Sequence, residues 1–267
     1  MLNAIRLYLR CMGISIRGQM QYRASFLMMS IGQFLITAIE FLAIWVLFER
    51  FGSIQGWALA EVALFYGLIN VAFSAGEAAV RGFDTFSSLV RSGDFDRVLL
   101  RPRSTALQVA ARELPLRRIG RFLQGLAVLL WASSALSVAW SPGRVAIAIA
   151  AILGGACLFA GLFVLQATLV FWTTESLEVM NCLTNGGVTA AQYPLTIYRP
   201  WFRRFFTFVV PLACVNYFPA LAVLSRPDPL GTPLVFQWAA PAVGVAFLAV
   251  ALQVWKIGVR HYRSTGS

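Results

Sequence analysis

The stretch "VAIAIAAILGGACLFAGLFVLQATLVFW", residues 145–172, decides the fold class, because none of its 28 side chains carries a charge. A helix of about 20 apolar residues crosses the hydrocarbon core of a bilayer. The stretch therefore predicts a transmembrane helix. The preceding residues "SPGR" at 141–144 predict a tight turn, since Pro and Gly interrupt regular structure.

Apolar runs of similar length recur along the whole chain. Of its 267 residues, 59% are hydrophobic and only 12% are charged, and the mean hydropathy is +0.72. Soluble domains carry about 25% charged residues. We therefore expect an all-α polytopic membrane protein, a single transmembrane permease domain over residues 1–267 with six spans. Five spans are residues 26–48, 58–80, 122–140, 145–172 and 234–255, and the sixth lies in the weaker region 176–230.

The basic residues predict the orientation of the chain in the membrane. Four precede the first apolar run, nine fall between residues 81 and 121, and three follow the last run. Arg50 and Arg144 lie in the links on the opposite side. Because Lys and Arg gather in cytoplasmic loops, both termini and the central loop are predicted to be cytoplasmic. We attribute the net charge of +11 to these loops and expect no nucleic-acid partner.

The N-terminal segment, residues 1–25, has the pattern of a helix that lies in the membrane interface. Its apolar stripe consists of Ile5, Leu9, Met12 and Ile16, and its basic flank of Arg6, Arg10 and Arg17. Arginines beside an apolar stripe can reach lipid phosphates while the stripe contacts the acyl chains.

The central loop, residues 81–121, contains short helical signals. Gly93 suits the end of one helix, and Asp94 suits the cap of the next, "FDRVLL", which Pro102 ends. Thr105 with Gln108 has the spacing of a capping box for a third helix. The arginines that follow predict a return to the membrane surface; they are Arg112, Arg117, Arg118 and Arg121.

Phe95, Val98 and Leu99 share one face of the predicted helix. This face has two interpretations of equal weight. It could fill a groove on a soluble partner, or it could pack against the ends of the protein's own spans.

Residues 176–230 can be threaded in two ways. In the first, residues 176–194 span the membrane and 195–230 form a broken re-entrant hairpin outside. Pro211 and Pro219 favour this threading, because the polar groups of irregular backbone at membrane depth must be hydrogen-bonded by protein or water. In the second, residues 205–224 span, as the basic cluster at 199–204 favours.

Two motifs resemble the permease subunit of a bacterial type-2 ABC exporter, in a subfamily of paired permeases served by one ATPase. The first motif, Gly-x-x-Asp/Glu followed by Leu-Leu-x-Pro, is matched by Gly93, Asp96, Leu99, Leu100 and Pro102. The second motif has a Tyr-Pro, an Ile-Tyr, a central Pro and a Tyr-x-Pro-Ala in this order. It is matched by Tyr193, Pro194, Ile197, Tyr198, Pro211, Tyr217, Pro219 and Ala220. The two motifs, with the order of the elements, extend the resemblance over essentially the whole chain.

The resemblance implies an elbow helix at 1–25, a cytoplasmic coupling helix, and an external re-entrant hairpin at 195–230. The residues it assigns to ATPase coupling are Gly93, Asp94, Phe95, Asp96, Val98, Leu99, Leu100 and Pro102. It also implies a bacterial inner-membrane location, membrane lipids as neighbours, a dimer of cytoplasmic ABC ATPase subunits, and a second permease, either a paralogue or the same chain. Export would proceed by alternating access.

The chain itself lacks the residues of an ATPase. A phosphate-binding loop needs a lysine directly before Ser or Thr, whereas the only lysine, Lys256, precedes Ile257. We expect a transport subunit rather than an enzyme, with no bound cofactor, and with ATP and Mg²⁺ on the partner ATPase. The four cysteines are widely spaced, which favours buried thiols over a metal site.

Two other functional classes fit parts of the sequence. An ion- or proton-coupled secondary transporter would use carboxylates within spans, and the candidates are Glu40, Glu77, Glu175 and Glu178. All but Glu40 are predicted to lie near the cytoplasmic ends, within reach of water. A membrane enzyme could bind a metal at Asp94 and Asp96, although helix capping and solvation explain that pair better.

The transported substrate cannot be identified from the sequence. Candidate residues of the substrate path are Glu40, Asn70, Asn181, Asn185, Tyr193, Tyr198 and Tyr217. Aromatic faces attract cations, but tyrosines also accumulate at membrane interfaces for reasons unrelated to transport.

Overall fold

The computed structural model describes residues 2–113, 118–173, 178–228 and 231–262. Within these ranges the regular structure is helical, apart from a single β-bridge between Ile54 and Trp57, which confirms the all-α prediction. The helices are α1 (Leu2–Gln19), α2 (Arg23–Phe51), α3 (Leu59–Asp84), α4 (Phe86–Arg91), α5 (Asp94–Leu99), α6 (Thr105–Ala110), α7 (Ile119–Ala135), α8 (Pro142–Thr173), α9 (Glu178–Ala191), α10 (Pro200–Arg204), α11 (Phe218–Leu224), α12 (Leu234–Ala239) and α13 (Ala242–His261).

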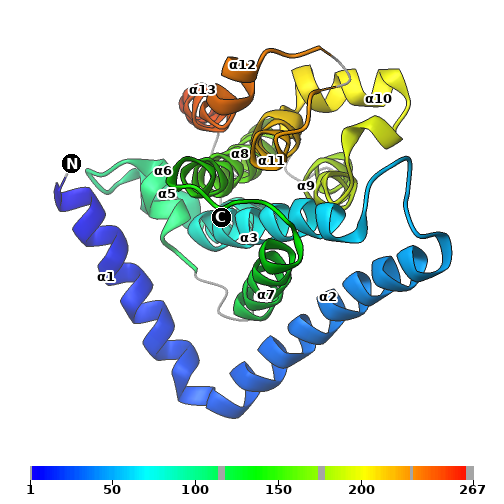
Figure 1. Ribbon diagram of the computed structural model, residues 1–267. Coiled ribbons are helices and arrows are strands. Elements are labelled where there is room, and N and C mark those ends of the chain that lie inside the picture. The colour runs from blue at the N-terminus through cyan, green and yellow to red at the C-terminus, as the bar shows by residue number, and fades with distance from the viewer. Residues whose placement is uncertain (1, 114–117, 174–177, 229–230, 263–267) are drawn as a thin grey trace.

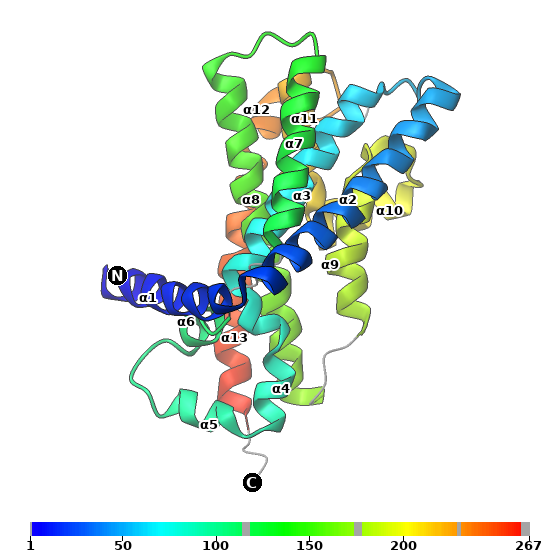
Figure 2. The same cartoon turned by 90° about the horizontal axis from the view of Figure 1, so that it is seen from below.

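Helix α3 is the centre of the bundle. It packs against α7 on one side and α8 on the other, and α8 packs in turn against α13 (Figure 2). Every residue from 61 to 74 is buried. A helix can bury side chains on all of its sides only in the interior of a bundle.

Helices α8 and α13 approach each other at backbone distance. A Cβ atom on Gly244 would overlap the carbonyl oxygen of Gly154, and a Cβ on Gly154 would overlap that of Pro241. Small residues at such crossings are typical of membrane helices, because they maximise van der Waals contact between backbones. No larger residue fits here without separating the two helices.

Helices α1 and α2 lie outside this bundle and form a wide V in Figure 1. α2 touches α7 through a narrow buried stripe of Ser30, Thr37, Phe41, Ile44 and Phe48. The rest of its surface exposes large apolar side chains, as a lipid-facing helix does.

Helix α1 crosses the direction of the bundle nearly at right angles in Figure 2. The Tyr8 hydroxyl donates a 2.8 Å hydrogen bond to the Ala79 carbonyl of α3. Burial raises the pKa of Tyr8, so this donor keeps its proton. Arg10, Ile16 and Arg17 are exposed. The other side chains of the predicted stripe and flank, namely Ile5, Arg6, Leu9 and Met12, lie outside the described residues.

Within the described residues, four helical segments are long and apolar enough to cross a membrane. They are Gly13–Phe51, Leu59–Arg91, Pro142–Thr173 and Ala242–His261, and a bent pair of helices raises the number to five. The run predicted over 122–140 is shorter than expected, because α7 ends at Ala135. Trp140 lies beyond the helix, and its indole Nε1 donates to the Ser133 carbonyl at 2.9 Å.

The region after α9 folds as a hairpin bent by 85° between Pro200–Val209 and Ala213–Leu224. Two π-helical turns, Phe205–Val209 and Ala213–Tyr217, flank the bend at Pro211. Proline lacks an N–H and cannot continue an ordinary helical hydrogen-bond ladder. The backbone therefore changes direction at this point.

Both ends of this hairpin lie beside the link between α2 and α3. Trp57 Nε1 donates to Thr196 Oγ1 at 3.1 Å, and the Arg226 guanidinium donates to the Gly56 carbonyl at 3.3 Å. The bend itself reaches the middle of the bundle, where Val215 packs against Gly155 of α8.

Candidate functional site

The coupling segment begins where α4 ends. Gly93 adopts a left-handed conformation with φ of 70°, and its N–H donates to the Val90 carbonyl at 3.1 Å, so it ends α4 as predicted. The expectation that Asp94 caps α5 was wrong, because Gly93 occupies the cap and Asp94 is the first helical residue. The Asp94 carboxylate instead accepts from Ser92 Oγ at 3.1 Å and from Arg97 at 3.3 Å.

Phe95 anchors α5 to the rest of the protein. Its side chain is fully buried, with ring-centroid distances of 5.0 Å to Phe86, 5.6 Å to Phe171 and 4.9 Å to Tyr262. Trp255 of α13 completes this aromatic cluster. For Phe95, the second interpretation of the apolar face therefore holds, since it packs against the protein's own helix ends.

The C-terminal end of the same element is exposed instead. Leu99 is 39% exposed and Leu100 is 85% exposed, whereas Val98 is half-buried. Pro102 is exposed and Asp96 is half-buried. The element thus has one aromatic anchor and one apolar edge that no other part of the described chain covers.

The predicted capping box at Thr105 and Gln108 is not formed. Thr105 Oγ1 accepts a hydrogen bond from Trp255 Nε1 at 3.1 Å. Gln108 Nε2 donates to the carbonyls of Val98 at 3.3 Å and Arg103 at 3.2 Å. Both side chains tie α6 to its neighbours instead of capping it.

Glu77 lies where α3 meets the start of α7. Its side chain is 2% exposed, so the expectation that water reaches it was wrong. Oε1 accepts from Arg81 at 3.1 Å and from Arg118 at 2.8 Å, and Arg81 also pairs with Asp84. One carboxylate therefore holds together the two helices that flank the coupling segment.

Arg121, predicted to mark the membrane surface, is buried within the bundle instead. Its Nε donates to Asn70 Oδ1 at 2.9 Å, and its guanidinium lies 4.6 Å from the centroid of the Phe73 ring. Asn70 Nδ2 donates to the Tyr66 carbonyl at 2.9 Å. Asn70, a candidate for the substrate path, is thus engaged within the α3–α7 interface.

The remaining path candidates fall into two groups. Glu40 is exposed on α2, and Asn181 and Asn185 are exposed on α9. The tyrosines Tyr193, Tyr198 and Tyr217, in contrast, lie around the place where α9 meets the hairpin. Glu175 and the side chain of Glu178 lie outside the described residues, as does the side chain of Cys11. Of the other cysteines, Cys214 is buried, Cys157 is half-buried and Cys182 is exposed, so burial was predicted correctly only in part.

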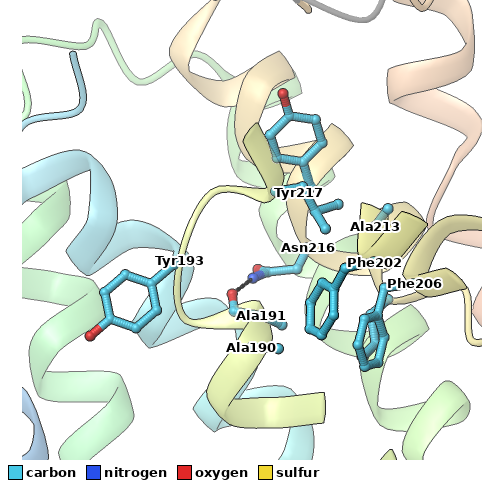
Figure 3. A pocket seen from close by; sticks show the side chains of 10 residues that line it. Ala190, Ala191, Tyr193, Phe202, Phe206, Ala213, Asn216 and Tyr217 are labelled. Atoms are coloured by element: carbon cyan, nitrogen blue, oxygen red, sulfur yellow. Dashed lines mark hydrogen bonds between the residues drawn. The ribbon is translucent and has the colours of Figure 1, made fainter. Parts of the chain in front are cut away.

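A small cavity lies between the end of α9 and the hairpin (Figure 3). It has room for about one water molecule. Its walls are aromatic and aliphatic side chains, and they include Tyr193, Phe202, Phe206, Leu212 and Tyr217.

Asn216 supplies the polar group of this cavity. Its Nδ2 donates to the Ala191 carbonyl at 2.6 Å, whereas its Oδ1 is buried and has no hydrogen-bond partner within the described chain. In Figure 3 the Tyr193 hydroxyl points away from Asn216. The Tyr217 hydroxyl donates to Asp228 at 3.1 Å. The cavity is therefore lined almost entirely by apolar and aromatic groups, and the Asn216 Oδ1 atom is buried at its wall.

Sequence reasoning missed Asn216, Phe202 and Phe206. The dense aromatic run "WFRRFFTF" at 201–208 was a usable signal, since so many aromatic rings beside a break must pack against something. Tyr198 was identified, and its ring stacks on Phe202 with a centroid distance of 4.6 Å.

The comparisons with known proteins identify the family. No curated protein and no solved structure is significantly similar to the chain. The sequence model of a family described as ABC-2 family transporter protein matches residues 34–266, which is most of the 267 residues. A match of this extent, on an all-helical chain with several membrane-length helices, means that the protein belongs to the ABC-2 transporter family and is a membrane transport subunit of the ABC type.

Proposed function

We propose that this chain is the membrane-spanning subunit of an ATP-driven exporter, and that α5 receives the movement of a separate ABC ATPase. The observation that carries the proposal is the division of α5 into a buried anchor, Phe95, and an exposed apolar edge, Leu99 and Leu100. An exposed apolar edge on a short helix fits a groove on a partner protein.

The anchor determines where a push on α5 would go. Phe95 contacts Phe86 of α4, Phe171 of α8 and, through Trp255, α13. Close-packed rings of this kind cannot be compressed, so displacement of Leu100 displaces the ends of three helices together. Closure of an ATPase dimer beneath α5 would in this way tilt the bundle and alternate access to the substrate path.

The proposed topology has six spans in a bacterial cytoplasmic membrane, with α1 as an interfacial elbow. Both termini and the α4–α6 segment lie in the cytoplasm, following the distribution of basic residues. The 85° bend at Pro211 supports a hairpin that enters and leaves on the outer side. The arginines at 199–204 then lie outside, against the general charge rule.

The substrate path is proposed to pass the Asn216 cavity, between α9 and the hairpin. Aromatic faces with one free acceptor oxygen would suit an amphiphile or a cation. A second permease subunit, a paralogue or another copy of this chain, completes the path. ATP and Mg²⁺ bind to the ATPase and not to this chain.

The surroundings of Glu77 also favour ATP-driven over ion-coupled transport. A coupling carboxylate must exchange its proton or ion during the cycle, whereas Glu77 is already neutralised by Arg81 and Arg118. Glu40 is exposed on the outer helix α2.

The test compares Leu100→Asp with Leu234→Asp in the complex reconstituted with its ATPase. Leu234 is 65% exposed at the start of α12, at the other end of the bundle from α5, so it is a matched control (Figure 2). We expect Leu100→Asp to insert normally but to lose most stimulation of ATP hydrolysis and co-purification of the ATPase. Leu234→Asp should retain both. Equal behaviour of the two variants would contradict the assignment of α5.

A further inference from the structure

A large open cavity lies between α1, α5 and α6, next to the exposed edge of α5. Its volume is about 820 Å³. Ile14 of α1, Val98 of α5 and Leu107 of α6 form apolar parts of its wall. Leu100, the proposed ATPase contact, is not part of the lining.

The charge of this cavity is strongly positive. Four arginines line it, Arg97, Arg101, Arg103 and Arg112, against a single carboxylate, Asp94. Asp94 pairs with Arg97 at 3.3 Å and with Arg112 at 3.8 Å. Among the described residues, no carboxylate forms an ion pair with Arg101 or Arg103. Two guanidinium groups thus face the cavity with their charge uncompensated.

The position of the cavity indicates the kind of anion that would reach it. α1 is the helix with the pattern of a membrane-interface helix, and Ile14 on it is 65% exposed. An apolar wall directly beside a guanidinium cluster matches a molecule with a phosphate at one end and hydrocarbon at the other. Basic pockets and clusters on the cytoplasmic side of membrane helices are a recognised setting for anionic head groups.

We propose that this cavity binds the phosphate of an anionic phospholipid from the cytoplasmic leaflet. Arg101 and Arg103 donate charge-assisted hydrogen bonds to the phosphate oxygens, while Ile14 and Leu107 contact the glycerol and upper acyl chain. The lipid then touches α1 and the α5–α6 link at once, so it holds the coupling segment against the membrane surface. The inference rests on the orientation proposed above but not on any contact with the ATPase.

The test measures lipid binding to the purified full-length chain in detergent. Phosphatidylglycerol and phosphatidylcholine are titrated, and bound lipid is counted by native mass spectrometry. The variant Arg101→Gln/Arg103→Gln is compared with Arg101→Lys/Arg103→Lys and with Arg50→Gln/Arg204→Gln. Arg50 and Arg204 are exposed and lie outside the cavity, at the far ends of α2 and α10, so the last pair carries the same charge change.

We expect the wild type to prefer phosphatidylglycerol over phosphatidylcholine. The double glutamine variant should lower that preference by about thirtyfold, because this is the typical contribution of two basic residues near an anionic surface. The lysine variant should keep most of the preference, and the control pair should change it less than about twofold, since its charges lie away from the bound lipid. The substitution Ile14→Trp adds bulk without altering charge and should also weaken binding. Circular dichroism verifies that each variant is folded.

Three outcomes would overturn the proposal. The first is an equal preference for phosphatidylglycerol in the wild type and the double glutamine variant. The second is loss of ATPase co-purification in that variant with lipid preference unchanged, which would assign the arginines to the ATPase. The third is displacement of the lipid by inorganic phosphate at equal concentration, which would retain the phosphate chemistry but identify a soluble ligand. Because lipid binding is measured without the ATPase, failure here is distinct from failure of the Leu100→Asp test.

Discussion

Removal of the Glu77 carboxylate should separate the two helices that flank the coupling segment. Glu77 is 2% exposed, and Arg118 and Arg81 are 21% and 14% exposed, so solvent screens these pairs only weakly. At the observed 2.8 Å between Arg118 and Glu77, the attraction of two unit charges is about 6 kcal/mol at an effective dielectric constant of ~20. Desolvation offsets part of this, but loss of one partner leaves an uncompensated charge. We therefore expect Glu77→Ala to cost about 3–5 kcal/mol.

The pair is measured by a double-mutant cycle of Glu77→Ala and Arg118→Met. Unfolding by sodium dodecyl sulfate in mixed micelles, followed by circular dichroism, gives the free energy of unfolding of each variant. We expect an interaction energy of about 1–3 kcal/mol, since the second substitution removes the charge that the first leaves unpaired. Arg97→Met with Asp94→Ala is the matched control, because Arg97 is 82% exposed. That pair should couple by less than about 1 kcal/mol.

Additivity of Glu77→Ala and Arg118→Met to within about 0.5 kcal/mol would refute this reasoning. It would mean that Glu77 and Arg118 do not stabilise one another, and that the start of α7 is held by Arg121 and by apolar packing.

Three further predictions concern packing, anchoring and orientation. Gly244→Val should lower the melting temperature markedly by forcing α8 and α13 apart, whereas Gly186→Val, which has no neighbour within 4 Å in the described chain, should lower it only slightly. Phe95→Ala should cost about 3–5 kcal/mol in the stability of α5, and faster amide hydrogen exchange over residues 94–99 would report it; unchanged exchange would contradict the anchor. A cysteine at Ser92, in a variant without native cysteines, should react with impermeant maleimides only from the cytoplasmic side; labelling from outside would reverse the topology.

The sequence predicted the long helices well, because a bilayer imposes a length and an apolar composition that are visible without any knowledge of packing. The run at 145–172 lies within α8, and the run at 58–80 lies within α3 apart from its first residue. The run at 234–255 was less accurate, since α12 ends at Ala239 and α13 begins only after Pro241.

Buried polar side chains could not be placed from the sequence. Arg121 was predicted at the membrane surface because an isolated arginine near a span normally remains in water. It is buried because Asn70 and Phe73 on α3 meet it, and that pairing depends on the rotation of two helices about their axes. Thr105 was misinterpreted for a similar reason, since its partner Trp255 is 150 residues away.

The sequence motifs identified only part of the candidate site. Tyr198 and Tyr217 were identified from motifs, and both lie beside the Asn216 cavity or in its wall. The division of α5 could not be foreseen, because the apolar face of a short helix does not show which of its residues other parts of the chain will cover. Phe95 and Leu99 looked equivalent in sequence, yet one is fully buried and the other is 39% exposed.

The contact between Gly154 and Gly244 limits how the protein can move. Where two backbones touch with no side chain between them, neither helix can rotate without driving a carbonyl into its neighbour. α8 and α13 therefore form one rigid unit. Because Phe95 contacts Phe171 of α8 and Trp255 of α13, a displacement of α5 would move both helices together rather than one past the other.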